Sequence, residues 1–170
     1  MKRFLIAAAL LAAACDGGSP TSDPATGARA PARAFPADTS VIFAGDKALE
    51  LTEPCSRPPP AQVEATWTPS EADIARMEPA LADLVADNLT AQFPNDRANA
   101  EDYHRQYGGL IIGGRRIIYV NGFDAPDTPD GADVWRTFPM IICDGGPIMF
   151  GVEYDPAERS FQNFAFNGGY

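Results

Sequence analysis

The clearest pattern of hydrophobic positions lies in the middle of the chain and predicts an amphipathic helix. Its apolar residues recur at spacings of three, four and seven, which places them on one buried face of a helix. Thr68 as N-cap with Glu71 three residues later is typical of a helix start. Pro79 removes a backbone hydrogen bond, so we expect a kink there or two abutting helices, ending before Pro94. The apolar positions are Ile74, Met77, Leu81, Leu84, Val85 and Leu89.

After residue 103 the pattern changes to short apolar and aromatic runs separated by Gly, Pro and Asp, which is typical of strands and turns. Gly113-Gly114 is a two-residue hairpin signal between the first two runs. The connections between the runs are short, so neighbouring strands are expected to be antiparallel. The five candidate strands cover residues 103–112, 115–121, 134–143, 147–154 and 160–167.

The region before the helix is less regular. Residues 41–43 could form a short strand, and one or two helical turns could follow Gly45 and run to Leu51. Residues 53–62 contain four prolines, which predicts an extended, irregular connection. One helical region packed on one face of a mostly antiparallel sheet of about five strands gives an α+β fold. We expect a single globular domain over residues 40–170.

The first fifteen residues, MKRFLIAAALLAAAC, predict an exported protein. Lys2 and Arg3 precede an apolar run, residues 4–14, that is too short to span a bilayer. The segment resembles a bacterial lipoprotein signal peptide that ends at its lipobox cysteine. The resemblance implies that Cys15 is acylated and becomes the new N-terminus; an ordinary secretory signal cleaved near Ala14 is the alternative. Several acyl chains would anchor the protein durably.

The segment that follows, residues 16–39, is dominated by Gly, Ser, Pro, Ala and Thr, which predicts a flexible tether. Asp16 directly after the cysteine resembles an inner-membrane retention signal of enteric bacteria. These features together predict a lipid-anchored protein on the periplasmic side of the cell envelope, with the inner membrane slightly favoured.

The charge of the chain restricts its partners. It has 13 Lys and Arg against 23 Asp and Glu, and a net charge of −10. This acidity argues against a nucleic-acid partner, because nucleic acids require a basic surface. It also disfavours contact with anionic lipid head groups, so we expect the membrane to be contacted through the lipid anchor only. An envelope protein or a small ligand remains as the expected partner.

Two cysteines, Cys55 and Cys143, remain after Cys15. Two cysteines in an oxidising compartment usually pair, which predicts a disulfide between the Pro-rich segment and the end of the third candidate strand. Two buried thiols are the alternative. The single histidine, His104, is distant from Cys143 in sequence, and no catalytic residue is predicted.

Tyr103, Arg105 and Tyr107 alternate along the first candidate strand and therefore share one face. A guanidinium between two aromatic rings could recognise an anionic or aromatic ligand through cation–π contact. A packed ladder of side chains on the sheet is the structural alternative. These three residues are the candidate ligand-binding residues of the sequence.

An acidic loop carries four carboxylates, at Asp124, Asp127, Asp130 and Asp133. Calcium prefers several oxygen ligands, but a carboxylate at every third position does not match a calcium-binding loop. We expect a solvated loop, no metal site and no cofactor. The chain also lacks the G-x-S-x-G and phosphate-loop patterns of common enzymes.

Four segments resemble a group of uncharacterised bacterial exported lipoproteins, and they span about residues 40–170. They are PCSRPPP, WTPSEADI, YHRQYGGLIIGGRRIIYVNGF and ICDGGPIMFGVEYDPAERSFQNFAFNG. The resemblance implies no known activity. The order of helix and sheet also resembles small cystatin-like domains, by fold analogy alone.

The sequence therefore predicts a lipid-anchored envelope protein that acts as a non-enzymatic binding or interaction module. A small extracytoplasmic enzyme, such as a hydrolase, is the first alternative, and a calcium-dependent envelope module is the second. A pocket that joins His104 to a carboxylate and a nucleophile would favour the enzyme. A sheet face of Tyr and Arg without such a triad would favour binding.

Overall fold

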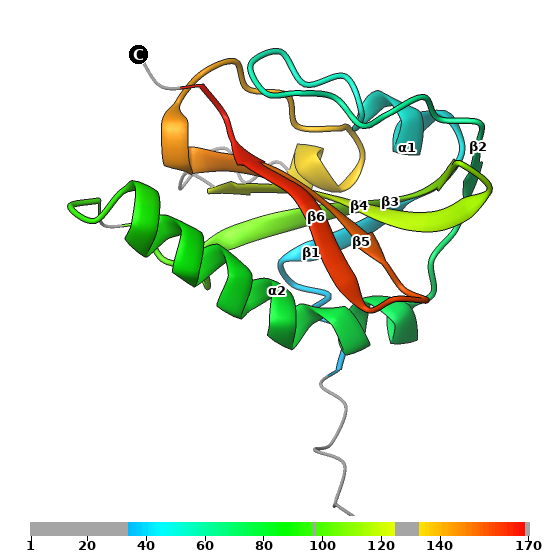
Figure 1. The fold of residues 1–170 in the computed structure, drawn as a ribbon, viewed down its shortest axis with the longest axis horizontal. Coiled ribbons are helices and arrows are strands. Elements are labelled where there is room, and N and C mark those ends of the chain that lie inside the picture. Colours follow the sequence, from blue (N-terminus) through cyan, green and yellow to red (C-terminus); the bar gives the residue numbers. More distant parts are fainter. Residues whose placement is uncertain (1–33, 97, 125–132, 169–170) are drawn as a thin grey trace, which may run out of the picture. The chain divides into compact units, whose positions relative to one another are not determined.

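The computed structural model describes residues 34–96, 98–124 and 133–168 (Figure 1). Its described part is an α+β fold with one long helix on a mostly antiparallel sheet, which confirms the predicted class. The strands are β1 Ser40–Phe43, β2 Ala65–Trp67, β3 Tyr103–Ile112, β4 Arg115–Asp124, β5 Met149–Asp155 and β6 Ser160–Phe166. The helices are α1 Asp46–Glu50 and α2 Glu71–Gln92, with short 3₁₀ helices η1 Asp133–Arg136 and η2 Gly146–Ile148.

The strand order in the described sheet is β1-β3-β4-β5-β6, and β2 also pairs with β3. Strands β3 to β6 are antiparallel in sequence order. Short turns join β3 to β4 and β5 to β6, as predicted, whereas residues 125–148 separate β4 from β5. The other edge of β3 is shared by two short strands. β1 runs parallel to residues 105–108, and β2 runs antiparallel to residues 109–111. The strand expected over residues 41–43 is therefore present, whereas β2 was not predicted.

The predicted strand over residues 134–143 is wrong. This segment begins with η1 and continues without regular structure to residue 143. Its apolar residues resembled a strand, but β1 and β2 already occupy the open edge of β3. The segment lies across the sheet instead, and side chains of the sheet bond to its backbone. We call residues 133–143 the covering segment.

Helix α2 begins two residues later than predicted. Its N-cap is Ser70, not Thr68: the Ser70 hydroxyl accepts from the Asp73 backbone N–H at 3.2 Å, and the Asp73 carboxylate accepts from the Ser70 N–H at 3.0 Å. This reciprocal pair satisfies two N–H groups that have no partner within the helix. Pro79 lies inside the helix, which continues to Gln92, so the expected split into two helices does not occur.

The sheet is covered differently on its two faces (Figure 1). On one face α2 buries the predicted apolar stripe against side chains of β3, β4 and β5, which forms the main core. On the other face lie α1, the Pro-rich connection and the covering segment, over a smaller apolar cluster that includes Phe43, Leu51 and Ile117. No helix in the described part of the chain is both long enough and apolar enough to cross a membrane.

Candidate binding surface

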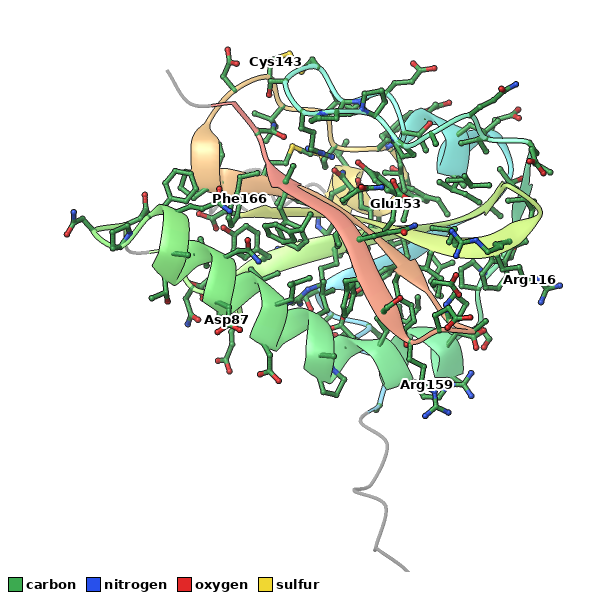
Figure 2. The ribbon with its side chains drawn as sticks, in the orientation of Figure 1. Asp87, Arg116, Cys143, Glu153, Arg159 and Phe166 are labelled. Atoms are coloured by element: carbon green, nitrogen blue, oxygen red, sulfur yellow. A yellow bond between two sulfur atoms is a disulfide. The ribbon has the colours of Figure 1, made fainter. Side chains whose placement is uncertain are left out.

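The face of the sheet opposite α2 is polar at its centre. Gln106 on β3 lies opposite Asn121 on β4, and Tyr119 on β4 lies opposite Glu153 on β5. All four residues are buried. Figure 2 shows Glu153 and Cys143 on the side of the sheet away from α2. Buried polar groups require hydrogen-bond partners, so whatever covers this face must supply them.

Arg57 of the Pro-rich connection supplies one set of partners. Its side chain reaches the sheet, where Nε donates to the Tyr119 hydroxyl at 3.3 Å and Nη2 donates to Asn121 Oδ1 at 2.5 Å. Nη1 donates to Asn167 Oδ1, beyond the end of β6. Arg57 is 7% exposed, and all three acceptors are neutral. We call this set the Arg57 clamp. It fixes an otherwise irregular connection on the sheet, because releasing it would leave several buried polar groups without partners.

The predicted disulfide between Cys55 and Cys143 is confirmed, and it closes the same corner of the molecule. Between Cys55 and Arg57, the Ser56 hydroxyl accepts from the backbone N–H groups of Asp144 at 2.9 Å and Gly168 at 3.3 Å. The disulfide therefore joins two irregular segments rather than a connection and a strand. Residues of the motifs PCSRPPP, ICDGG and FNG, which are far apart in sequence, therefore meet at this corner.

Gln106 and Asn121 hold the covering segment. Gln106 Nε2 donates to the carbonyl oxygens of Trp135 at 2.5 Å and Phe138 at 2.8 Å, and its Oε1 accepts from the Met140 N–H at 2.8 Å. Asn121 Nδ2 donates to Gln106 Oε1 at 3.1 Å and to the Met140 carbonyl at 2.9 Å. Two side-chain amides thus replace the hydrogen-bond ladder that a neighbouring strand would provide.

Three apolar side chains of the covering segment face the solvent as a consequence, whereas Trp135, Met140 and Ile142 are half-buried. Phe138 is 61% exposed, Val134 and Ile141 are each 48% exposed, and Leu49 of α1 is 39% exposed. The ammonium group of Lys47 joins α1 to the segment, since it lies 5.4 Å from the centre of the Phe138 ring and donates to the Thr137 carbonyl. We call Leu49, Val134, Phe138 and Ile141 the apolar patch. Apolar side chains gathered on a surface mark an interaction site more often than scattered ones do.

Tyr103, Arg105 and Tyr107, the candidate ligand-binding residues, lie on the other face, beneath α2. All three are buried, at 5% exposure or less. Arg105 donates to the Ala100 carbonyl at 2.8 Å and lies 3.7 Å from the Glu78 carboxylate, and the Tyr107 hydroxyl donates to Glu78. Burial and the neighbouring Glu78 charge raise the pKa of Tyr107, which keeps its hydroxyl protonated as a donor. The three side chains pack as a ladder within the core.

His104 lies on the same face as the covering segment, between two aromatic residues. Its ring stacks on Phe123 at 5.8 Å and meets the edge of Trp135 at 4.7 Å. Burial and the charges of Arg136 and Arg105 lower the pKa of His104, so the ring is neutral at pH 7. Within the described ranges its buried Nδ1 has no hydrogen-bond partner.

The structure describes only some of the remaining candidate residues from the sequence. Cys15 and the two central carboxylates of the acidic loop, Asp127 and Asp130, lie outside the described residues. Asp124 and Asp133, at the two ends of that loop, are exposed. In the described part of the chain, no group of three or more His, Cys, Asp or Glu side chains is placed to hold a metal ion.

Comparison of the chain with protein-family models, curated proteins and solved structures found no match. The similarity of its motifs to bacterial exported lipoproteins therefore stays a prediction.

Sequence reasoning missed the residues that build this surface. Arg57 stands alone among prolines, and Asn121 interrupts the apolar run IIYVN of β4. A single polar residue in a strand with both faces covered indicates a buried hydrogen-bond network, and this signal was available. The outward orientation of Phe138 had no comparable signal, because it depends on bonds to Gln106, 32 residues away.

Gly151 tests how tightly the Arg57 clamp is packed. A Cβ atom at this position would lie 2.6 Å from the Tyr119 hydroxyl and closer still to Arg57 Nε. Gly151→Ala should therefore displace the guanidinium and lower the free energy of unfolding by about 2–3 kcal/mol, measured by urea denaturation. Gly168→Ala is the matched control, because its nearest neighbour would be at 3.4 Å. Equal stability of the two variants would show that the clamp is loose.

Proposed function

We propose that this protein is a lipid-anchored binding module of the bacterial cell envelope that recognises its partner through the apolar patch. The N-terminal leader and Cys15 support the anchor, and the orientation of the covering segment supports the binding role. That orientation carries the proposal: backbone polar groups of the segment bond inward to Gln106 and Asn121. Its exposed apolar side chains, Val134, Phe138 and Ile141, face the solvent. Burying those side chains against a partner would be favourable.

The way the covering segment is held also favours binding. The disulfide at Cys143 holds its C-terminal end, and Gln106 and Asn121 hold its middle. Arg136 donates to the carbonyl oxygens of Ala37 and Asp38 at 2.8 and 2.6 Å and so holds its N-terminal end. A surface ordered before the partner arrives loses less conformational entropy on binding.

The anchor is tested with Cys15→Ser. We expect wild-type protein from cells to enter the detergent phase in phase partitioning, because its acyl chains are hydrophobic, and the variant to lose acylation. Mass spectrometry of the N-terminal peptide measures acylation directly. Wild-type protein found wholly in the aqueous phase, with an unmodified N-terminal peptide, would contradict the anchor.

The binding surface is tested by site-specific photocrosslinking in intact cells. A benzophenone amino acid in place of Phe138 should form a discrete adduct with an envelope component, because this ring protrudes most from the patch. The same amino acid in place of Thr90, exposed on α2, is the control. An equal yield and pattern of adducts at both positions, or no adduct at 138, would show that the patch is not a binding surface.

A further inference from the structure

We propose that the partner of the apolar patch is a positively charged, amphipathic polypeptide segment, with Leu, Ile or Phe side chains flanked by Lys or Arg. This inference rests on the proposed function and adds the chemical class of the partner. The charges around the patch carry this inference, because exposed negative charge would attract a cationic partner and repel an anionic membrane or an acidic protein.

Carboxylates flank the patch and face the solvent. Asp46 and Glu50 are the first and last residues of α1, the helix that carries Leu49, and both are exposed. On the covering segment, the side chain of Asp133 is 73% exposed and directly precedes Val134. Because Asp133 pairs with Arg136, the negative charge presented to an approaching partner comes from Asp46 and Glu50 of α1.

The two cations of this region are already engaged within the protein. Lys47 lies against the rings of Phe43 and Phe138 and donates to the Thr137 carbonyl. Arg136 pairs with Asp133 at 3.2 Å, stacks over Trp135 at 4.2 Å and donates to two carbonyl oxygens near the start of the fold. Arg136 offsets the charge of Asp133, and the contacts of Lys47 direct its ammonium group toward Phe138 and Thr137. Asp46 and Glu50 are therefore the exposed carboxylates open to a partner beside Leu49.

An apolar centre with an acidic rim is complementary to an apolar sequence flanked by cations. Such a partner would bury its Leu or Phe side chains against Phe138 and Ile141, and its Lys or Arg side chains would meet Asp46 and Glu50. A second copy of this chain would bring like charges together, since the chain carries a net charge of −10. Anionic lipid head groups would be repelled in the same way.

The test uses the full chain carrying Cys15→Ser and a designed amphipathic helical peptide made of Leu and Lys. Isothermal titration calorimetry should detect binding of this peptide but not of its counterpart in which Glu replaces every Lys. Phe138→Ser with Ile141→Ser should raise the Kd by about tenfold or more. Both side chains are exposed, so folding should be retained, and urea denaturation checks this.

The charge contribution is measured with two matched double variants. Asp46→Asn with Glu50→Gln should raise the Kd by about three- to tenfold and weaken its dependence on salt. Asp83→Asn with Asp87→Asn removes the same charge from α2, where both residues are exposed and Asp87 points away from the sheet (Figure 2). This control should leave the Kd within about twofold of its original value.

Three results would overturn the inference: equal weakening by both double variants, binding of the Glu peptide, or no binding of the Lys peptide. Patch-dependent binding to vesicles of anionic phospholipid would also overturn it, in favour of a membrane surface. If an adduct forms at position 138 while the Lys peptide does not bind, the proposed function stands and only the partner class is wrong. If both experiments fail, both proposals are wrong.

Discussion

Replacement of Cys55 and Cys143 together by serine should lower the free energy of unfolding by about 4–5 kcal/mol, because the disulfide closes a loop of 88 residues and restricts the unfolded chain. The free energy of unfolding of a typical domain is about 5–15 kcal/mol in total, so this loss should bring the variant close to unfolding. Urea denaturation without reductant measures the loss. The covering segment should also become sensitive to protease, since one of its attachments is gone.

The control for this prediction is reduction of the wild-type protein. Wild-type protein in dithiothreitol should unfold at the same urea concentration as the double variant, and the variant should not respond to dithiothreitol. A loss below about 1 kcal/mol would mean that the disulfide adds little to what the Arg57 clamp and Ser56 already hold. In that case Gly151→Ala should become the more damaging change.

Arg105→Met should lower the free energy of unfolding by about 3–5 kcal/mol, because it leaves the Glu78 carboxylate buried without its cation. The two side chains are 7% and 11% exposed, and the guanidinium lies 3.7 Å from the carboxylate. Burial of an unpaired charge is one of the largest single effects known in mutated cores. Urea denaturation at pH 7 gives the loss.

The second variant removes the charge from both partners. Glu78→Gln combined with Arg105→Met should recover at least about 2 kcal/mol of the loss, because the neutral amide can still accept from the Tyr107 hydroxyl. Failure of the combined variant to exceed Arg105→Met in stability would show that Arg105 acts through its packing or its bonds to backbone carbonyls. Glu78→Gln alone completes the double-mutant cycle.

Local patterns predicted the secondary structure wherever one periodicity dominated. The stripe from Ile74 to Leu89 identified α2, and alternation with turn residues located β3, β4, β5 and β6. The errors arose where two local signals competed. Thr68 and Ser70 are both capable N-caps, and the choice between them depended on Asp73, which bonds back to Ser70. The apolar residues of 134–143 matched a strand only because their partners in space were unknown.

The candidate site was harder to predict than the fold. Tyr103, Arg105 and Tyr107 share a face, as expected, but nothing local indicated that α2 would cover that face. Arg57 looked like one polar residue among prolines, and only its position over Gly151 and Tyr119 shows that it clamps two segments together.

Taken alone, the sequence determined the features that depend on neighbours within a few residues, or on counting. These are the amphipathic helix, the four main strands with their tight turns, the acidic charge, and a pair of cysteines suited to bond. Tertiary structure alone decided which face of β3 became core and which side chains of the covering segment stayed exposed. Those outcomes depend on bonds between residues far apart in sequence, such as Tyr107 to Glu78, 29 positions apart, and Gln106 to Phe138, 32 positions apart. Backbone groups must find partners when they are buried, and the partners available are set by what the rest of the chain brings close.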